Sequence, residues 1–289
     1  DHPSYSDLPG VWVLIGGLWV AHFAYWGFNQ YITQRALGAK SLPEAQKGVM
    51  FAAFLKLVMP IVVVLPGICA VVLIPQLDSP DTAYPAMMGL LPSGLLGLTF
   101  AALIAAIVSS LASMTNSVST IFTMDIYKQF LSEQVDERKL VVVGRNVALI
   151  SIVVAALCAQ PLLGNLESAF QYIQNFTGFF TPGILVIFLV ALFWKKATSL
   201  SVLVAALASL ILSIAMFMFA PDDFPFQHRM GIVFLVTGFL CYMTALVQGY
   251  TDQEKAVDLN SINFQTSKGF NISTLVILVI LIIIYSVWW

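Results

Sequence analysis

Three groups of polar side chains lie inside long apolar stretches of this 289-residue sequence, where polar groups are costly and mark candidate functional positions. The first group is His22, Tyr25 and Trp26, preceded by Gly16 and Gly17. Their i, i+3, i+4 spacing places the three rings on one helical face, and the paired glycines permit a break in the helix. Broken membrane helices expose backbone dipoles to bound solutes, so this face is a candidate ligand surface. A packed aromatic helix with a hydrogen-bonded histidine is the alternative.

The second group suits a ligand rich in hydroxyl groups. Lys56 lies roughly 12 Å inside an apolar segment, where its ammonium can donate to hydroxyls or pair with an acid from outside this chain. The alternative is a stem that snorkels to the membrane surface. Gln171 and Gln174 share a helical face, and their amides both donate and accept, although interhelical hydrogen bonding also explains them. Pro182 removes the backbone hydrogen bond to Gly178 and predicts a bend.

The third group is the small-residue stretch 105–113, Ala-Ala-Ile-Val-Ser-Ser-Leu-Ala-Ser. Ser109 and Ser110 offer two hydroxyl oxygens, and the carbonyl of Ala106 would add a third oxygen if its backbone hydrogen bond weakened. Hard cations prefer oxygen ligands, so the spacing is compatible with a sodium ion held together with another helix. Small residues at every fourth position also let a second helix approach closely, and packing alone explains the stripe.

Composition places these groups in a membrane protein. The chain is 59% hydrophobic and only 10% charged, against roughly 25% charged residues in soluble domains. A net charge of -2 gives no basic field for nucleic acid. The cysteines, Cys69, Cys158 and Cys241, lack the spacing of a zinc site or a disulfide framework. Motifs of phosphate-binding loops, zinc proteases and serine hydrolases are missing, so neither a soluble enzyme nor a nucleic-acid-binding protein is expected.

Continuous apolar runs of about 20 residues predict membrane-spanning helices, and their continuity disfavours the alternating strands of a β-barrel. The predicted spans lie near residues 10–30, 49–75, 92–123, 139–161, 168–194, 198–220, 230–249 and 270–289.

Basic residues orient these spans, because Lys and Arg accumulate on the inner side. With residue 1 outside, most of the 13 basic residues fall on the inner side, namely Arg35, Lys40, Lys47, Lys128, Arg138, Lys139, Arg145, Lys195, Lys196, Lys255 and Lys268. We therefore expect a multi-pass protein of the cell (inner) membrane, embedded in the lipid bilayer, with both ends on the outer, periplasmic side. Because the first residue is not Met, the sequence reads as the C-terminal part of a longer chain.

Several stretches together resemble the solute:sodium symporter family, in particular the bacterial sodium/galactose and animal sodium/glucose symporters. They are DLPG at 7–10, YWGFNQYITQR at 25–35, FLKLVMPIVVVLPG at 54–67, AAIVSSLASMTNSVSTIFTMDIYK at 105–128 and AFQYIQNFTGFFTPG at 169–183. The resemblance runs in order along essentially the whole chain. It implies an all-α integral membrane protein with a LeuT-type core. Residues 1–195 would form the second five-helix inverted repeat, and residues 196–289 three peripheral transmembrane helices. The first, N-terminal repeat would be a partner absent from this sequence.

The resemblance also implies roles for the polar groups. Tyr25 resembles the family's aromatic inner gate, with Trp26 beside it, and Lys56 and Gln174 resemble ligands of sugar hydroxyls. His22 departs from the pattern, because the bacterial galactose symporter has asparagine there; we nevertheless include His22 and Gln171 among the expected sugar contacts.

Ala106, Ser109 and Ser110 resemble the family's sodium site, in which one carbonyl and two hydroxyl groups hold the ion. The implied activity is sodium-coupled sugar transport by alternating access, without enzyme chemistry and with sodium as the coupling ion. The alternatives are sodium symport of another solute (an inositol, a sugar acid or an amino acid), a channel, or a membrane sensor.

Overall fold

The computed structural model describes residues 12–74, 76–77, 79–131, 136–163, 169–221, 224–254 and 256–288, and every regular element in these ranges is a helix. The expected all-α class is therefore confirmed. The chain divides into two compact units. Unit 1 holds the described residues of Asp1–Thr33 and Phe170–Gln265, and unit 2 those of Gln34–Ala169 and Thr266–Trp289. The expected division at residue 195 concerns sequence repeats and stays a prediction.

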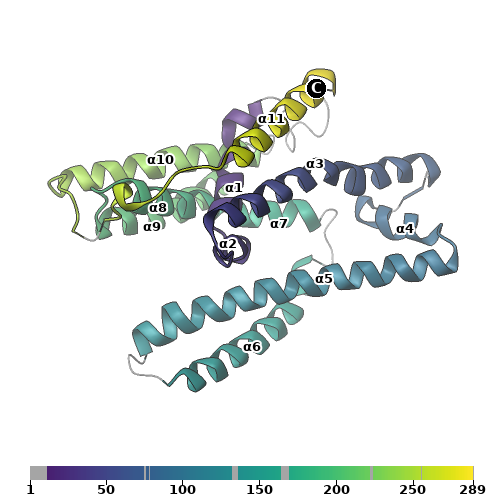
Figure 1. Ribbon diagram of the computed structural model, residues 1–289, viewed down its shortest axis with the longest axis horizontal. Helices are drawn as coiled ribbons and strands as arrows, with labels where there is room; N and C mark the ends of the chain where they lie inside the picture. The colour runs from purple at the N-terminus through teal and green to yellow at the C-terminus, as the bar shows by residue number, and fades with distance from the viewer. Residues whose placement is uncertain are drawn as a thin grey trace. The chain divides into compact units, whose positions relative to one another are not determined.

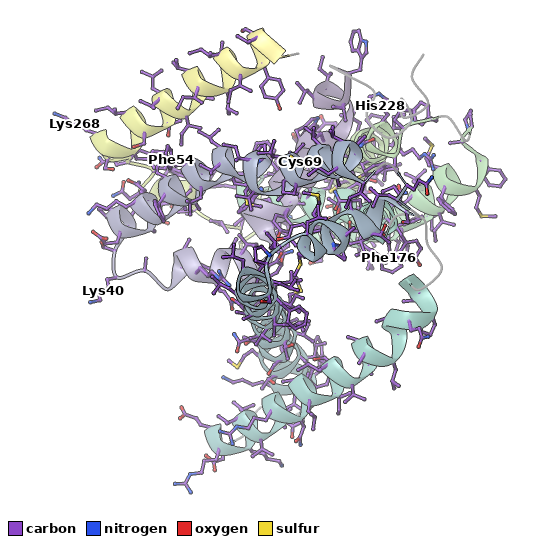
Figure 2. The ribbon with its side chains drawn as sticks, turned by 90° about the vertical axis from the view of Figure 1, so that its right-hand side faces the viewer. Lys40, Phe54, Cys69, Phe176, His228 and Lys268 are labelled. Carbon is purple, nitrogen blue, oxygen red and sulfur yellow. The ribbon has the colours of Figure 1, made fainter. Side chains whose placement is uncertain are left out.

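Six helices of the described ranges are long and apolar enough to cross a membrane. They are α3 (Leu42–Leu73), α5 (Ser93–Ile121, continued by the π-helical η5, Phe122–Leu131), α6 (Glu137–Leu163), α9 (Ser199–Phe219), α10 (Phe226–Val247) and α11 (Lys268–Trp288). A seventh span forms if α7 (Ala169–Gly178) and α8 (Thr181–Phe193), which meet at 42°, count together. Large apolar side chains remain exposed along them, such as Phe54 on α3 (Figure 2). Such a surface suits lipid or further helices rather than water.

The first predicted span differs from its expectation. Its described part consists of η2 (Leu14–Leu18), α1 (Trp19–Phe23) and η3 (Ala24–Phe28), which is shorter than the roughly 20 residues of a full span. Gly17 leaves the helical conformation, with φ 177° and ψ -3°, so the predicted break at the glycines is confirmed. A second break, which was not predicted, lies at the extended residue Asn29, before α2 (Gln30–Leu37). Against the eight predicted spans, the described residues contain six or seven helices of sufficient length.

In unit 1, α9 and α10 pack on α8 and on each other (Figure 1). Small or hydroxyl-bearing residues at every fourth position let α9 approach its neighbours closely; these buried residues are Ser201, Ala205, Ser209 and Ser213. A reciprocal cap begins α9, since Ser201 N–H donates to Thr198 Oγ1 at 3.1 Å and Thr198 N–H donates to Ser201 Oγ at 3.0 Å. A buried cluster of Val186, Ala205 and Cys241 joins the helices α8, α9 and α10.

The segment after α10, with the short helix η6 (Leu259–Ser261), is tied back to the end of α8. Lys195 Nζ lies 3.3 Å from Asp258 Oδ1, and the N–H of Gln253 donates to the carbonyl of Lys195 at 2.8 Å. The backbone N–H of Asn260 and the ammonium of Lys195 hold the pKa of Asp258 below its usual value. These contacts connect the polar loop to the helix bundle of unit 1.

In unit 2, α3 is followed by η4 (Pro80–Thr82), α4 (Ala83–Gly89), α5 and α6. The helices α5 and α6 approach closely at Gly144, whose carbonyl accepts a hydrogen bond from Ser119 Oγ at 2.8 Å. The helix α11 packs on α3, and the N–H of Ser267 at its start donates to Gln46 Oε1 at 3.0 Å.

Glycines bring the first segment of the chain, which consists of η2, α1 and η3, into direct backbone contact with α10. A Cβ atom on Gly17 would collide with the carbonyl oxygen of Gln227 and lie 2.7 Å from the backbone nitrogen of Gly231. A Cβ on Gly231 would in turn collide with the carbonyl oxygen of Gly16, and a Cβ on Gly16 with the ring of His228. The break at Gly17 is therefore held against α10 by contacts that no larger residue permits.

We expect Gly231→Ala to lower thermal stability, because the added methyl group meets backbone atoms that cannot move aside. Overpacking of this kind costs about 1–3 kcal/mol, measurable as a lower Tm of the detergent-solubilised protein. The matched control is Gly238→Ala on the same helix, where a Cβ has no neighbour within 4 Å. Equal Tm values for the two variants would contradict the described backbone contact.

Candidate functional site

An aromatic cluster forms around the second break of the first segment. The rings of Tyr25 and Trp26 meet edge to face with centroids 5.2 Å apart, and those of Tyr25 and Tyr31 do so at 5.9 Å. The hydroxyl groups of Tyr25 and Tyr31 are hydrogen-bonded to each other. Tyr25 and Trp26 remain 41% and 42% exposed, so both offer ring surface to a ligand. Tyr25 and Trp26 lie on the π-helical turn η3, and Tyr31 lies on α2. π-Helical turns occur often at functional sites.

The residues that pack the first segment differ from the candidate residues. Val20 of α1 and Ala24 of η3 are buried in a cluster with Leu185 of α8. His22, Tyr25 and Trp26 are exposed. Of these three rings, Tyr25 and Trp26 are in contact, and the common face of all three stays a prediction.

The bend predicted from Pro182 is present between α7 and α8, whose axes differ by 42°. Thr181 Oγ1 spans the bend by donating to the carbonyl of Thr177 at 2.8 Å. Gln174 is half-buried on α7, and among the described residues no hydrogen bond or ring contact joins its amide to the aromatic cluster. The side chain of Gln171 lies outside the described part of the structure.

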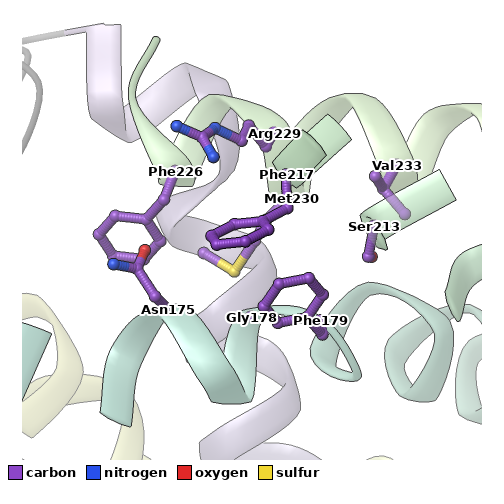
Figure 3. A pocket seen from close by; sticks show the side chains of 9 residues that line it. All are labelled: Asn175, Gly178, Phe179, Ser213, Phe217, Phe226, Arg229, Met230 and Val233. Carbon is purple, nitrogen blue, oxygen red and sulfur yellow. The ribbon is translucent and has the colours of Figure 1, made fainter. Parts of the chain in front are cut away.

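A small chamber beside this bend was not anticipated from the sequence. It lies between α7, α9 and α10 and is lined by the side chains shown in Figure 3, among them Phe217, Arg229 and Met230. The guanidinium of Arg229 donates from Nη2 to the carbonyl of Phe224 at 2.8 Å. A volume of about 30 Å³ accommodates a water molecule but no sugar. The chamber is therefore excluded as the principal solute site.

The candidate sodium residues lie on one turn of α5. Ala106, Ser109 and Ser110 are exposed, and in the described ranges neither serine hydroxyl makes a hydrogen bond, so both can turn their oxygens toward a cation. The helix is regular from Ser93 to Ile121. The weakened backbone hydrogen bond that would free the Ala106 carbonyl is therefore not seen here. No group of three or more His, Cys, Asp or Glu side chains suited to a metal occurs among the described residues.

Lys56 is exposed on α3. Ala106, Ser109 and Ser110 form what we call the serine turn of α5. Lys56 and the serine turn belong to unit 2, whereas the aromatic cluster and Gln174 belong to unit 1. The ligand-binding candidates predicted from the sequence are therefore divided between the two units.

Comparison with known proteins gives the family. The model of the sodium:solute symporter family matches residues 2–212. The chain belongs to this family. It is 47% identical to the sodium/glucose cotransporter of Vibrio parahaemolyticus, with the alignment covering 100% of this chain and 56% of that protein. It is also 34% identical to the human sodium/myo-inositol cotransporter 2, over 73% of this chain and 34% of the relative. An uncharacterised symporter of Escherichia coli, YidK, is 28% identical over 93% of this chain and 48% of the relative.

Membership in a symporter family confirms the expected resemblance and classes the chain with membrane transporters rather than enzymes. The chain spans about half the length of the Vibrio parahaemolyticus and Escherichia coli relatives.

Proposed function

We propose that the chain is part of a sodium-coupled sugar symporter that works by alternating access. The observation that carries this proposal is the 47% identity, along the whole chain, to a protein named as a sodium/glucose cotransporter. The finer architecture belongs to the proposal as well. Residues 1–195 would form the second inverted repeat of a LeuT-type core, residues 196–289 three peripheral helices, and the N-terminal repeat would complete the site.

In the proposed mechanism, sodium and sugar are both cargo. Sodium would bind to the hydroxyl groups of Ser109 and Ser110 and the carbonyl of Ala106, together with oxygens of the N-terminal repeat. Binding would tie α5 to that repeat in the outward-open state. A membrane potential of about 100 mV contributes about 2.3 kcal/mol for each sodium ion moved inward, which suffices for an accumulation of tens-fold.

The sugar would bind against the exposed face of His22, Tyr25 and Trp26. Aromatic rings offer flat apolar surface to the C–H groups of a sugar, while the ammonium of Lys56 and the amides of Gln171 and Gln174 suit its hydroxyl groups. The hydrogen bond between Tyr25 and Tyr31 supports a gating role for Tyr25, because movement of the ring would require that bond to break. Both ends of the chain would lie on the periplasmic side of the inner membrane.

A second candidate substrate is myo-inositol. Its support is the 34–36% identity to proteins named as sodium/myo-inositol cotransporter 2. Galactose, glucose and myo-inositol are all polyhydroxyl rings, so the same residue types serve each of them. His22 is the residue that we expect to distinguish them, because imidazole has a different shape and hydrogen-bonding pattern from asparagine.

Proteoliposomes holding the full-length transporter test the function directly. An inward sodium gradient is expected to drive transient accumulation of labelled galactose, glucose or myo-inositol, and an equal potassium gradient is not. Accumulation of myo-inositol alone would select the second candidate. Absence of sodium-driven uptake of any solute in a wider panel would contradict symport and favour a channel or a sensor.

Ser110→Ala tests the sodium site. Loss of one of the proposed oxygen ligands is expected to raise the sodium concentration for half-maximal uptake about tenfold. This change corresponds to a loss of about 1.4 kcal/mol of binding free energy, similar to the contribution of one hydrogen bond. Sodium titration of uptake measures this value. Ser286→Ala on α11 serves as control, because the Ser286 hydroxyl donates to the carbonyl of Ile282 on its own helix at 2.6 Å. A sodium dependence identical in both variants would exclude the proposed site.

Lys56→Ala tests the sugar contact. Removing the ammonium is expected to raise the sugar concentration for half-maximal uptake about tenfold or more, because a charged hydrogen bond contributes about 1.5–3 kcal/mol, while the amount of protein in the membrane stays the same. Lys47→Ala is the matched control on the same helix, since its ammonium is engaged by Glu44 at 2.7 Å on an exposed surface. Unchanged sugar affinity in the Lys56 variant would assign its ammonium to the membrane surface.

A further inference from the structure

The last turn of α2 is hydrogen-bonded to α5 one helical turn beyond the candidate sodium residues. Arg35 Nη2 donates to Ser113 Oγ at 2.6 Å. Beside it, Asn116 Nδ2 donates to Gln34 Oε1 at 3.5 Å. All four residues belong to unit 2. The end of a short helix is therefore fastened to two successive turns of α5, although the contacts join residues that are 78 and 82 positions apart in the sequence.

Ser113 transmits this contact to the backbone of the serine turn. Its Oγ donates to the carbonyl oxygen of Ser109 at 3.0 Å. A guanidinium can only donate, and a serine hydroxyl has one proton. With Arg35 bound to an oxygen lone pair, the proton of Ser113 is left to point at Ser109.

Two physical effects follow for the turn that carries Ser109. A serine that donates to the carbonyl four residues earlier competes with the helical N–H for that oxygen atom. A charged donor strengthens the bond that it makes, and linked hydrogen bonds polarise one another. The chain from Arg35 through Ser113 to Ser109 therefore sets the orientation of the turn more firmly than a lone serine would.

We propose that Arg35 is a positioning residue for sodium binding, acting through Ser113 on the backbone of the turn that carries Ser109 and Ser110. This inference rests on the proposed function, because it takes sodium to bind at these serines. A direct electrostatic effect would have the opposite sign, since a nearby cation repels sodium. The direction of the change in sodium affinity on removal of the Arg35 charge therefore separates positioning from direct repulsion.

The test is sodium titration of sugar uptake by the full-length transporter carrying Arg35→Gln. We expect the half-saturating sodium concentration to rise about three- to tenfold, with the maximal rate at saturating sodium near that of the wild type. Arg35→Lys keeps a charged donor and is expected to restore most of the sodium affinity. Ser113→Ala is expected to act in the same direction as Arg35→Gln. The double variant is expected to be no worse than the more affected single variant, because both changes cut one link.

Thr120→Ala is the matched control. Its Oγ1 donates to the carbonyl of Asn116 at 2.8 Å, the same kind of bond on the same helix, and its loss should change sodium affinity less than about twofold. Tighter sodium binding in Arg35→Gln, or additive losses in the double variant, would overturn the inference. If Ser110→Ala shifts the sodium dependence and Arg35→Gln does not, the positioning role alone fails. If neither variant shifts it, the proposed sodium site itself fails.

Discussion

Direct backbone contact between Gly16–Gly17 and Gly231 is the constraint on which the arrangement of unit 1 depends. In a membrane, a helix break leaves backbone polar groups that lipid cannot satisfy. Such a break persists only where other protein covers it or where it lines a hydrated cavity. At Gly17 the covering element is α10, which approaches so closely that its own residue 231 must also lack a side chain. The break and its cover are therefore one feature formed by two distant parts of the chain.

The first segment packs on α8 beyond this contact. With its beginning held on α10, Val20 of α1 and Ala24 of η3 are buried in a cluster with Leu185 of α8. His22, Tyr25 and Trp26 remain exposed. The break at Asn29 then turns the chain into α2, so that Tyr31 reaches the hydroxyl of Tyr25. In a straight helix, the rings of Tyr25 and Tyr31, which are six residues apart, would not meet. The break at Asn29 brings them into one cluster.

The features that could be predicted from sequence are those with local causes. Apolar runs predict helices, Gly16–Gly17 a break, and Pro182 the bend between α7 and α8, because each depends on the backbone chemistry of nearby residues. The sequence around Asn29 did not predict a break. Without knowledge of this break, the hydrogen bond between Tyr31 and Tyr25 could not be predicted either. The contact between Arg35 and Ser113 joins residues 78 apart, and no helical periodicity relates them. The serine turn was identified from its oxygen atoms, but its link to α2 depends on tertiary packing.

The short helix α2 has a property that bears on how sodium and sugar transport could be coupled. Tyr31 near its start is bonded to the aromatic residue Tyr25, and Arg35, one helical turn later, is bonded to α5 through Ser113. Coupling between two ligands is reciprocal and typically amounts to about 1–3 kcal/mol. A hydrogen bond from a charged donor contributes about 1.5–3 kcal/mol, so making or breaking the contact of Arg35 is large enough to carry such a coupling. An eight-residue helix is short enough to move as one body. Under the proposed roles, in which Tyr25 is the gate and sodium binds at Ser109 and Ser110, a displacement of Tyr25 that pulled on Tyr31 would therefore also load the bond between Arg35 and Ser113.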